Sequence, residues 1–410
     1  MIVRRYPTWF VVLGSICLAT LGAGCAGGRT VQETARVKRV PEETLRQHGL
    51  ETVWFFPPDS ADTPVTTVEL FPQGLFIATQ PMEKKPGRLK LLSRTSGSPE
   101  WFVELKYPLK YPPSVYQYPQ GVTGKPNEVY FTQLDTVHCL DLRYGDELWA
   151  AELPFAVSTR VVADEFRYFA GSDTGRAYSI RKKSASEEWT YRTGNRIQAS
   201  PVVQGDSVFI ASTDGSAYRL LSVAPGWITG SSWQRATGSR ILGDPVPFSR
   251  WVLVGSSDYK LYCLEAQDGT PFWAFPAEAP IEDTPVVYSF RSNQEFAYCV
   301  TVQRTPRAEK RTLFSLKLKD GSEMWRRTGI RKVVSLGRRS LYVINDPAPG
   351  EGRFLIALDV MNGEEQFRIP ADGFDFIPIN SADSGRDTSE RGRVYMVAQD
   401  GTIQVIGERT

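Results

Sequence analysis

The residue types that most often carry enzyme chemistry are sparse in this chain. It has two histidines, His48 and His138, among 410 residues, and no cluster of cysteine and histidine has the spacing of a metal site. So few histidines also leave no candidate Ser/His/Asp nucleophile set. No glycine-rich phosphate-binding loop follows a strand and opens a helix. We therefore expect no catalytic residue, no metal ligand and no bound cofactor.

One cysteine stands where a different chemistry, lipid attachment, is expected. Arg4 and Arg5 precede an apolar run over 9–21, and three small residues then lead to Cys25. This arrangement is typical of a secretory signal peptide, and the run is short for a membrane-spanning helix. A cysteine directly after small residues resembles a bacterial lipobox, so we predict a signal peptide over 1–24 and lipid attachment at Cys25. The alternative is a plain cleaved signal peptide with an incidental cysteine.

The charge balance excludes one class of partner. The chain has 48 basic and 46 acidic residues, and the segment before Cys25 holds two arginines and no acids. The mature chain therefore carries equal numbers of both signs. General nucleic-acid binding needs a basic surface that displaces counterions from phosphates. We expect no nucleic-acid partner, while the charge balance does not exclude local charged patches.

Large aromatic residues recur along the chain at intervals of 40 to 52 residues. A period of this length with strand-like content is typical of a β-propeller, in which each repeat forms one blade and the blades pack side by side in a ring. We interpret these residues as structural anchors, one per blade. They are Trp54, Trp101, Trp149, Trp189, Trp233, Trp273, Trp325 and Phe367.

The repeat has an internal pattern that predicts the strands of a blade. In four repeats a glycine stands four residues before the aromatic anchor: Gly145, Gly269, Gly321 and Gly363. Glycine accepts positive φ, so it suits a tight hairpin turn, and the anchor then lies in the last strand, where its flat side chain can dock on the neighbouring blade. Pro-Val-Val segments such as 201–203 and 285–287 predict the first strand, because proline there interrupts no hydrogen-bond ladder.

The blade count closes at eight. The last stretch, 394–406, supplies two strands of a blade without a final strand, and 49–56 supplies a final strand with Trp54 and nothing before it. Joined together they complete one blade and remove free sheet edges. We predict an all-β, eight-bladed propeller of four-stranded antiparallel blades over 49–410, with the last blade closed by the N- and C-terminal strands. Seven blades with an unpaired N-terminal segment is the alternative.

The remaining cysteines and histidines fit structural positions in this scheme. Cys139 and Cys263 occupy the same small-side-chain position of their repeats, in blades too far apart for a disulfide. Cys299 stands alone on a strand. We expect buried free thiols, and we expect His138, which alternates with apolar neighbours, to be a structural histidine.

The segment between Cys25 and the propeller is predicted to be a tether. It spans 25–48 and includes a short helix over 41–49, which begins with proline, has acidic residues in its first turn and ends at glycine. We expect this segment to hold the propeller away from a membrane.

The pattern Leu-Tyr-x-Leu-[Asp/Glu]-x-x-x-Gly-x-x-x-Trp, as it stands at 261–273, resembles the quinoprotein-type (PQQ-like) propeller repeat. The resemblance covers nearly all the mature chain. Together with the lipoprotein signal it resembles the family of the lipoprotein B subunit of the outer-membrane β-barrel assembly machinery. This resemblance implies an eight-bladed propeller anchored by lipid to the periplasmic face of the outer membrane. It implies envelope proteins as partners, the barrel-assembly complex among them, with this chain acting as a monomer within a complex.

A quinone-dependent oxidoreductase is the enzyme alternative within the same repeat family. Such enzymes resemble one another in a pair of adjacent cysteines beside the quinone and in carboxylates on channel-facing strands. This chain has no adjacent cysteines, and the nearest acids to its predicted inner strands are Asp244 and Asp283. We interpret both as turn-forming acids beside a proline.

Irregular connections on a rigid scaffold are the expected place for binding. Turns between the second and third strands should share one face with the connectors between blades. Three of these turns are long, 80–90, 303–312 and 345–353, and the connector after blade 1 is rich in tyrosine and proline. Exposed tyrosine on a stiff segment binds with little loss of entropy. The candidate partner-binding residues are Lys84, Lys85, Arg88, Tyr107, Tyr111, Tyr116, Tyr118, Arg304, Arg307, Lys310 and Arg311. Ordinary solvated loops are the alternative.

Three functional classes follow from the sequence. The first is a non-catalytic scaffold in outer-membrane protein assembly. The second is an envelope propeller that binds a ligand or a glycan in some other role. The third is the quinone-dependent oxidoreductase. The repeat predicts the fold far more strongly than the role, because propellers serve many functions.

Overall fold

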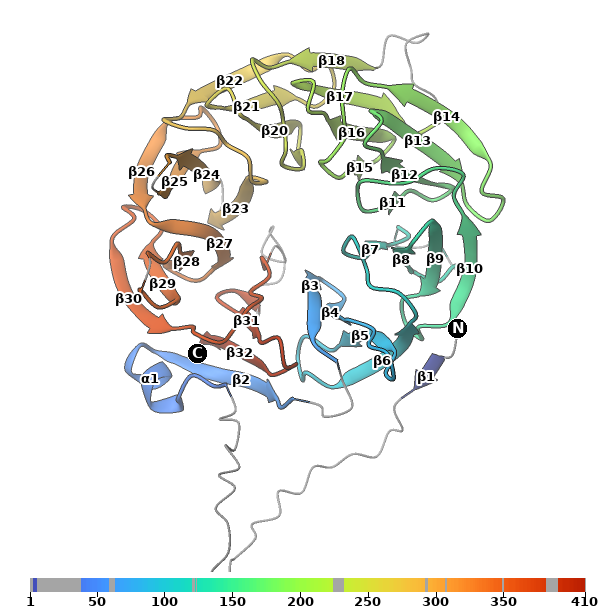
Figure 1. The fold of residues 1–410 in the computed structure, drawn as a ribbon. Coiled ribbons are helices and arrows are strands. Elements are labelled where there is room, and N and C mark those ends of the chain that lie inside the picture. Colours follow the sequence, from blue (N-terminus) through green and yellow to red (C-terminus); the bar gives the residue numbers. More distant parts are fainter. Residues whose placement is uncertain are drawn as a thin grey trace, which may run out of the picture.

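Eight β-sheets stand around a central axis in the computed structural model, each forming one blade of a propeller (Figure 1). The structure describes residues 3–5, 38–58, 63–119, 122, 124–223, 232–291, 294–306, 308–348, 350–380 and 390–409. The predicted eight-bladed fold is confirmed. Cys25, Arg307 and the signal segment apart from residues 3–5 lie outside the described residues.

The first four blades follow one another along the chain. Blade 1 comprises β3 (Val65–Phe71), β4 (Gly74–Thr79), β5 (Gly87–Leu92) and β6 (Pro99–Leu105). Blade 2 comprises β7 (Ser114–Tyr116), β8 (Glu128–Gln133), β9 (Thr136–Asp141) and β10 (Glu147–Glu152). Blade 3 comprises β11 (Val162–Ala163), β12 (Arg167–Gly171), β13 (Arg176–Arg181) and β14 (Glu187–Arg192). Blade 4 comprises β15 (Val202–Gln204), β16 (Ser207–Ala211), β17 (Ser216–Leu221) and β18 (Trp233–Ala236).

Three more complete blades follow. Blade 5 comprises β19 (Val246–Phe248), β20 (Trp251–Ser256), β21 (Lys260–Glu265) and β22 (Pro271–Pro276). Blade 6 comprises β23 (Val286–Arg291), β24 (Gln294–Arg304), β25 (Glu309–Lys317) and β26 (Glu323–Thr328). Blade 7 comprises β27 (Ile330–Leu336), β28 (Ser340–Asn345), β29 (Phe354–Asp359) and β30 (Glu365–Pro370). All neighbouring strands within these blades pair antiparallel, and β1 (Val3–Arg5) adds a fifth strand to blade 1 along the outer side of β6.

Blade 8 joins the two ends of the described propeller, as predicted. β31 (Val394–Val397) pairs with β32 (Ile403–Glu408), and β32 pairs with β2 (Leu50–Phe56) from the other end of the chain. Phe376 bridges Val397 in the position of the innermost strand. The sheet therefore has three regular strands and a single bridge where the other blades have a regular first strand.

The predicted helix is present, but its position differs from that expected of a tether. α1 (Glu42–Gln47) buries Leu45 completely in an apolar cluster shared by blades 7 and 8. The backbone of Val40 exchanges two hydrogen bonds with the side chain of Gln404, at 2.8 and 3.0 Å. The ring of His48 stacks on Phe367 with 4.6 Å between centroids. Residues 38–48 are thus part of the propeller body, because they cover the joint where the two ends of the chain meet.

The apolar core is divided into clusters that lie between adjacent blades. One such cluster combines Phe76, Leu89 and Trp101 of blade 1 with Val129 and Phe131 of blade 2. A blade of four short strands buries too little surface by itself, and most of its apolar contacts are therefore made with its neighbours.

Six of the predicted tryptophan anchors connect one blade to the next by a hydrogen bond. Each indole Nε1 donates to a backbone carbonyl of the following blade over 2.8 to 3.0 Å. The donors are Trp54, Trp101, Trp189, Trp233, Trp273 and Trp325. The hydrogen bond satisfies the polar end of a largely buried ring.

The glycine of each motif receives the ring of the preceding blade's anchor. Gly145 has φ +74°, and an added Cβ would lie 2.7 Å from the ring of Trp101. Gly269, Gly321 and Gly363 stand in the same relation to Trp233, Trp273 and Trp325. The glycine therefore serves two purposes at once: it forms the turn, and it leaves room for the ring.

Replacing Gly145 with alanine should destabilise the propeller more than the same change at Gly205. Both glycines have positive φ, but nothing lies within 4 Å of a Cβ at Gly205. The control should cost about 1 kcal/mol from backbone strain alone. Gly145→Ala should cost about 1–3 kcal/mol more, because the methyl group overpacks against Trp101. Urea unfolding followed by circular dichroism measures both, and equal losses would contradict the packing role.

Candidate interaction face and central charged cluster

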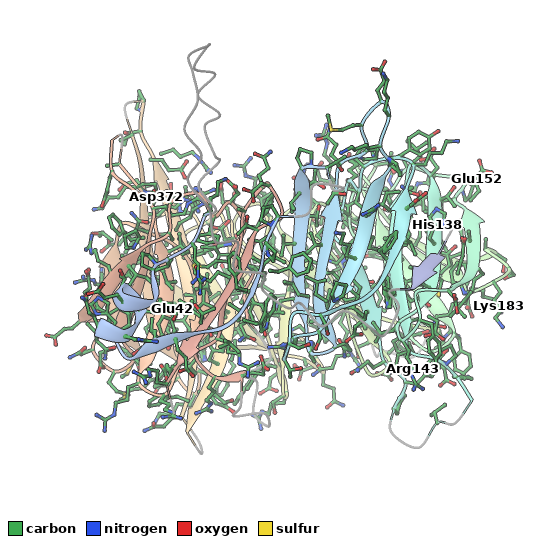
Figure 2. All side chains as sticks on the ribbon, turned by 90° about the horizontal axis from the view of Figure 1, so that it is seen from below. Glu42, His138, Arg143, Glu152, Lys183 and Asp372 are labelled. Atoms are coloured by element: carbon green, nitrogen blue, oxygen red, sulfur yellow. The ribbon has the colours of Figure 1, made fainter. Side chains whose placement is uncertain are left out.

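The propeller has two faces, and one of them carries the connections between blades. We call it the connector face: it holds the turns between second and third strands and the links from each outermost strand to the next blade. Figure 2 shows Glu152 and Asp372 at this face and Arg143, in the turn between β9 and β10, at the opposite one. Most of the predicted partner-binding residues belong to connections of this face.

Tyr107 and Tyr111 lie in the link between blades 1 and 2, as predicted. The carbonyl of Tyr107 accepts a 2.6 Å hydrogen bond from Gln133, while its side chain is 38% exposed beneath the Lys106 ammonium. Tyr111 is half-buried and packs against the apolar cluster that blades 2 and 3 share. Tyr107 is the more available of the two for a partner.

Tyr116 and Tyr118 lie near the opposite face, so the structure does not bring them together with the other candidates. β7 is three residues long, and Tyr116 at its end pairs with Glu128, the first residue of β8. Tyr118 packs edge-to-face on Tyr116, and the ammonium of Lys182 lies 4.4 Å from the ring centroid of Tyr116. Lys182 also pairs with Glu128 at 2.6 Å. Burial raises the pKa of Tyr116 to about 12 and lowers the pKa of Lys182. The cluster ties blade 2 to blade 3.

The basic residues of the long turns differ in how far their charges are neutralised. Lys84 and Lys85 are exposed in the turn between β4 and β5, and the Arg88 guanidinium lies over Phe102. In the hairpin of β24 and β25, Lys310 is exposed. Arg304 pairs with Glu282 at 2.6 Å, and Arg311 pairs with Asp283 and Glu309 at 2.8 Å each. The two arginines of the hairpin are therefore paired with acids, while Lys310 of the hairpin is exposed, as are Lys84 and Lys85 of blade 1.

Charged side chains from several blades also meet near the central axis. Arg160, just before β11, lies 3.7 Å from Glu69 of β3 and 4.0 Å from Asp244, just before β19. Burial raises the pKa of both carboxyls, against the opposing charge of Arg160. Three alternate blades thus interact across the axis. This contact was hard to predict from the sequence, because Arg160 and Glu69 hold no fixed position in the repeat.

Asp244 and Asp283 do more than form turns. A carboxylate oxygen of Asp244 accepts a 2.6 Å hydrogen bond from the backbone N–H of Ser200, and its own N–H donates to the Thr284 hydroxyl over 2.9 Å. Asp283 holds Arg311. Asp244 therefore links blade 5 to blades 4 and 6, whereas the ion pair of Asp283 lies within blade 6.

The thiols and the histidine on strands have structural surroundings, as predicted. Cys139, Cys263 and Cys299 are free and buried, and burial raises the pKa of each thiol to about 12. His138 Nδ1 lies 3.0 Å from a carboxylate oxygen of Glu147, and the ring stacks on Phe131. Within the described ranges, no three His, Cys, Asp or Glu side chains gather as a metal site would require. No helix in the same ranges has the length and apolar character needed to span a bilayer.

Comparison with known proteins finds one matching family model and two solved structures with a similar fold. The family model described as outer membrane protein assembly factor BamB matches residues 133–226 and 224–410. The crystal structure of BamB from Moraxella catarrhalis has a TM-score of 0.60 at 14% identity, covering 87% of this chain and 99% of that one. The computationally designed Ika8 protein has a TM-score of 0.56 at 12% identity, with the same coverage. At these identities the structural likeness establishes the fold. No curated protein sequence matches.

Proposed function

This chain belongs to the outer membrane protein assembly factor BamB family, and on that premise we propose that it is a non-catalytic scaffold in the assembly of outer-membrane proteins. The match over residues 133–410 carries the proposal. The signal segment supports an anchor: a lipid on Cys25 would hold the propeller at the periplasmic face of the outer membrane. In this position the propeller would act as a monomer that binds other envelope proteins within a larger complex.

The connector face near blade 1 is the surface that we assign to the partner. It combines the exposed amines of Lys84 and Lys85 with Tyr107. Met82 in the same turn is 58% exposed, and its backbone pairs with Lys85 in a tight bridge. A rigid turn bearing a methionine and two cations, beside an exposed tyrosine, provides the mixed apolar and polar contacts of a protein interface.

Crosslinking in intact envelopes followed by mass spectrometry tests the scaffold role. The tagged native protein should enrich the outer-membrane subunit that inserts β-barrels. A Cys25→Ser variant should leave the outer-membrane fraction if the lipid anchor is correct. Enrichment of an unrelated envelope protein in place of the inserting subunit would leave the shared fold intact but refute the assembly role.

Replacing Tyr107 with alanine should weaken this crosslink without changing stability. Removing an exposed interface tyrosine typically costs about 1–2 kcal/mol of binding, which is roughly fivefold or more in affinity. Tyr144→Ala is a matched control, because Tyr144 is 39% exposed and lies beside the Arg143 guanidinium, but belongs to the opposite face. Similar losses from both variants, or no loss from Tyr107→Ala, would exclude the connector face near blade 1 as the binding surface.

A further inference from the structure

A cavity of about 330 Å³ lies between the inner strands of blades 6 and 7. It is reached from the connector face, since Asp283 and Thr284 precede β23, and Arg331 and Lys332 open β27. A volume of this size is at the lower end of the range for small-molecule sites and is equivalent to roughly ten water molecules.

The wall of the cavity has an apolar part and a charged part. Val286, Val300, Val333 and Ile379 provide aliphatic surface. The charged part consists of Asp283, Arg311, Arg331 and Lys332. A molecule that fits both parts must have a short apolar body and one polar end, which is the usual composition of a small-ligand site.

Most of the charges in this wall are already matched. Arg311 lies between Asp283 and Glu309, each at 2.8 Å, and Arg331 lies 3.6 Å from Asp346. Lys332 differs from them: its ammonium makes no hydrogen bond and no ion pair of ordinary length with any residue that the structure describes. A partly buried cation without a paired anion is unfavourable, and a bound anion would compensate it.

The electrostatic surroundings of Lys332 also disfavour its charged form. Burial lowers the pKa of its amine to about 8, and the charges of Arg331 and Arg353 act in the same direction. Glu69 from β3 and Asp283 oppose the shift without cancelling it. The lysine is therefore mostly charged at neutral pH but loses its proton within an accessible pH range.

We propose that this cavity binds a small organic monoanion, with its carboxylate on Lys332 and a short aliphatic tail against the valines of blades 6 and 7. A single unpaired amine matches a single negative charge. Asp283 and Glu69 are close enough to influence Lys332, and they would repel a dianion such as a phosphate monoester. This binding site is independent of the scaffold role, because it requires no protein partner.

Calorimetric titration of the full mature chain with three probes tests the proposed composition of the ligand. Hexanoate carries both the charge and the tail, acetate carries the charge alone, and 1-hexanol carries the tail alone. Hexanoate should bind at least tenfold more tightly than either of the others at pH 7. Equal binding of hexanoate and 1-hexanol would overturn the assignment of the charge to the site, and no binding of hexanoate would overturn the proposal entirely.

Two variants locate the charge. Lys332→Met keeps the length of the side chain and should weaken hexanoate binding at least tenfold, with the unfolding curve unchanged. Lys332→Arg keeps a charge that does not titrate and should retain binding.

The pH dependence separates a direct role of Lys332 from a structural one. Because the amine with a pKa of about 8 is charged below that pH, hexanoate should bind roughly tenfold more weakly at pH 9 than at pH 7. Lys332→Arg should remove this dependence. Hexanoate binding that is insensitive to Lys332→Met, or a pH dependence that persists in Lys332→Arg, would show that Lys332 does not hold the anion.

Discussion

Replacing Trp101 with alanine is expected to lower the free energy of unfolding by about 3–5 kcal/mol, the range found when a large aromatic side chain is removed from a core. Trp101 is completely buried. Its ring packs edge-to-face on Phe76 and lies against Gly145, and its Nε1 donates to the Leu142 carbonyl over 2.8 Å. Alanine would leave a cavity between blades 1 and 2 and an unpaired carbonyl.

Trp149→Ala provides the comparison within the same repeat. Trp149 is only partly buried, and the corresponding turn of blade 3 has Lys183 and Ala185 at positive φ in place of a glycine. Its removal should therefore cost clearly less than the removal of Trp101. Urea denaturation of both variants gives the two values. A loss below about 1 kcal/mol for Trp101→Ala would show that blades 1 and 2 are not joined through this ring.

Arg94→Met is expected to destabilise the ring closure by about 3–5 kcal/mol, because it removes one of the two arginines that pair with a buried carboxylate and breaks several buried hydrogen bonds. Arg94 of blade 1 pairs with Glu390, just before β31, at 2.9 Å, and both side chains are at most 7% exposed. Its guanidinium also donates to Asn380 over 3.0 Å and to the Tyr395 hydroxyl over 3.3 Å. This network joins blade 1 to blade 8.

A double-mutant cycle checks that the loss arises from the ion pair. Adding Glu390→Gln to Arg94→Met also removes the buried carboxylate that has lost one of its two arginines, and it should recover part of the stability. Lys125→Met is the exposed control: its 2.7 Å pair with Glu165 is open to solvent and should contribute no more than about 1 kcal/mol. Additive losses from the two buried changes would indicate that Arg94 acts through packing alone.

The fold was predictable because the same sequence pattern recurs in most of the blades. The aromatic anchors, the glycines and the proline-led strands each recur, so an error in one repeat is corrected by the others. What the spacing did not reveal is that Gly145 receives the ring of Trp101 from the blade before it, rather than that of Trp149 in its own blade. Contacts between repeats have the same period as contacts within a repeat, and sequence spacing alone does not distinguish them.

The candidate site was less predictable, because it depends on features outside the repeat. The sequence predicts Tyr116 and Tyr118 at the connector face, as part of the link between blades 1 and 2. In the structure the link ends earlier, because β7 begins at Ser114 and runs towards the opposite face; Tyr116 is its last residue, and Tyr118 follows it. The interaction of Arg160 with Glu69 and Asp244 joins blades 1, 3 and 5. Neither Arg160 nor Glu69 stands at a position that the repeat marks. Their contact follows from the closed ring of blades, which sequence spacing does not describe.

The pairing of β2 with β32 also determines the order in which the molecule assembles. Leu50 pairs with Glu408, so the contact that completes the ring joins positions separated by nearly the whole polypeptide. Closing so long a loop is entropically costly and slow, while each hairpin can form locally. Blades 1 to 7 can therefore take shape as their residues become available, but blade 8 must wait for the final strand. Until then β2 remains an open edge, and a chain cut short before β32 would keep that edge permanently.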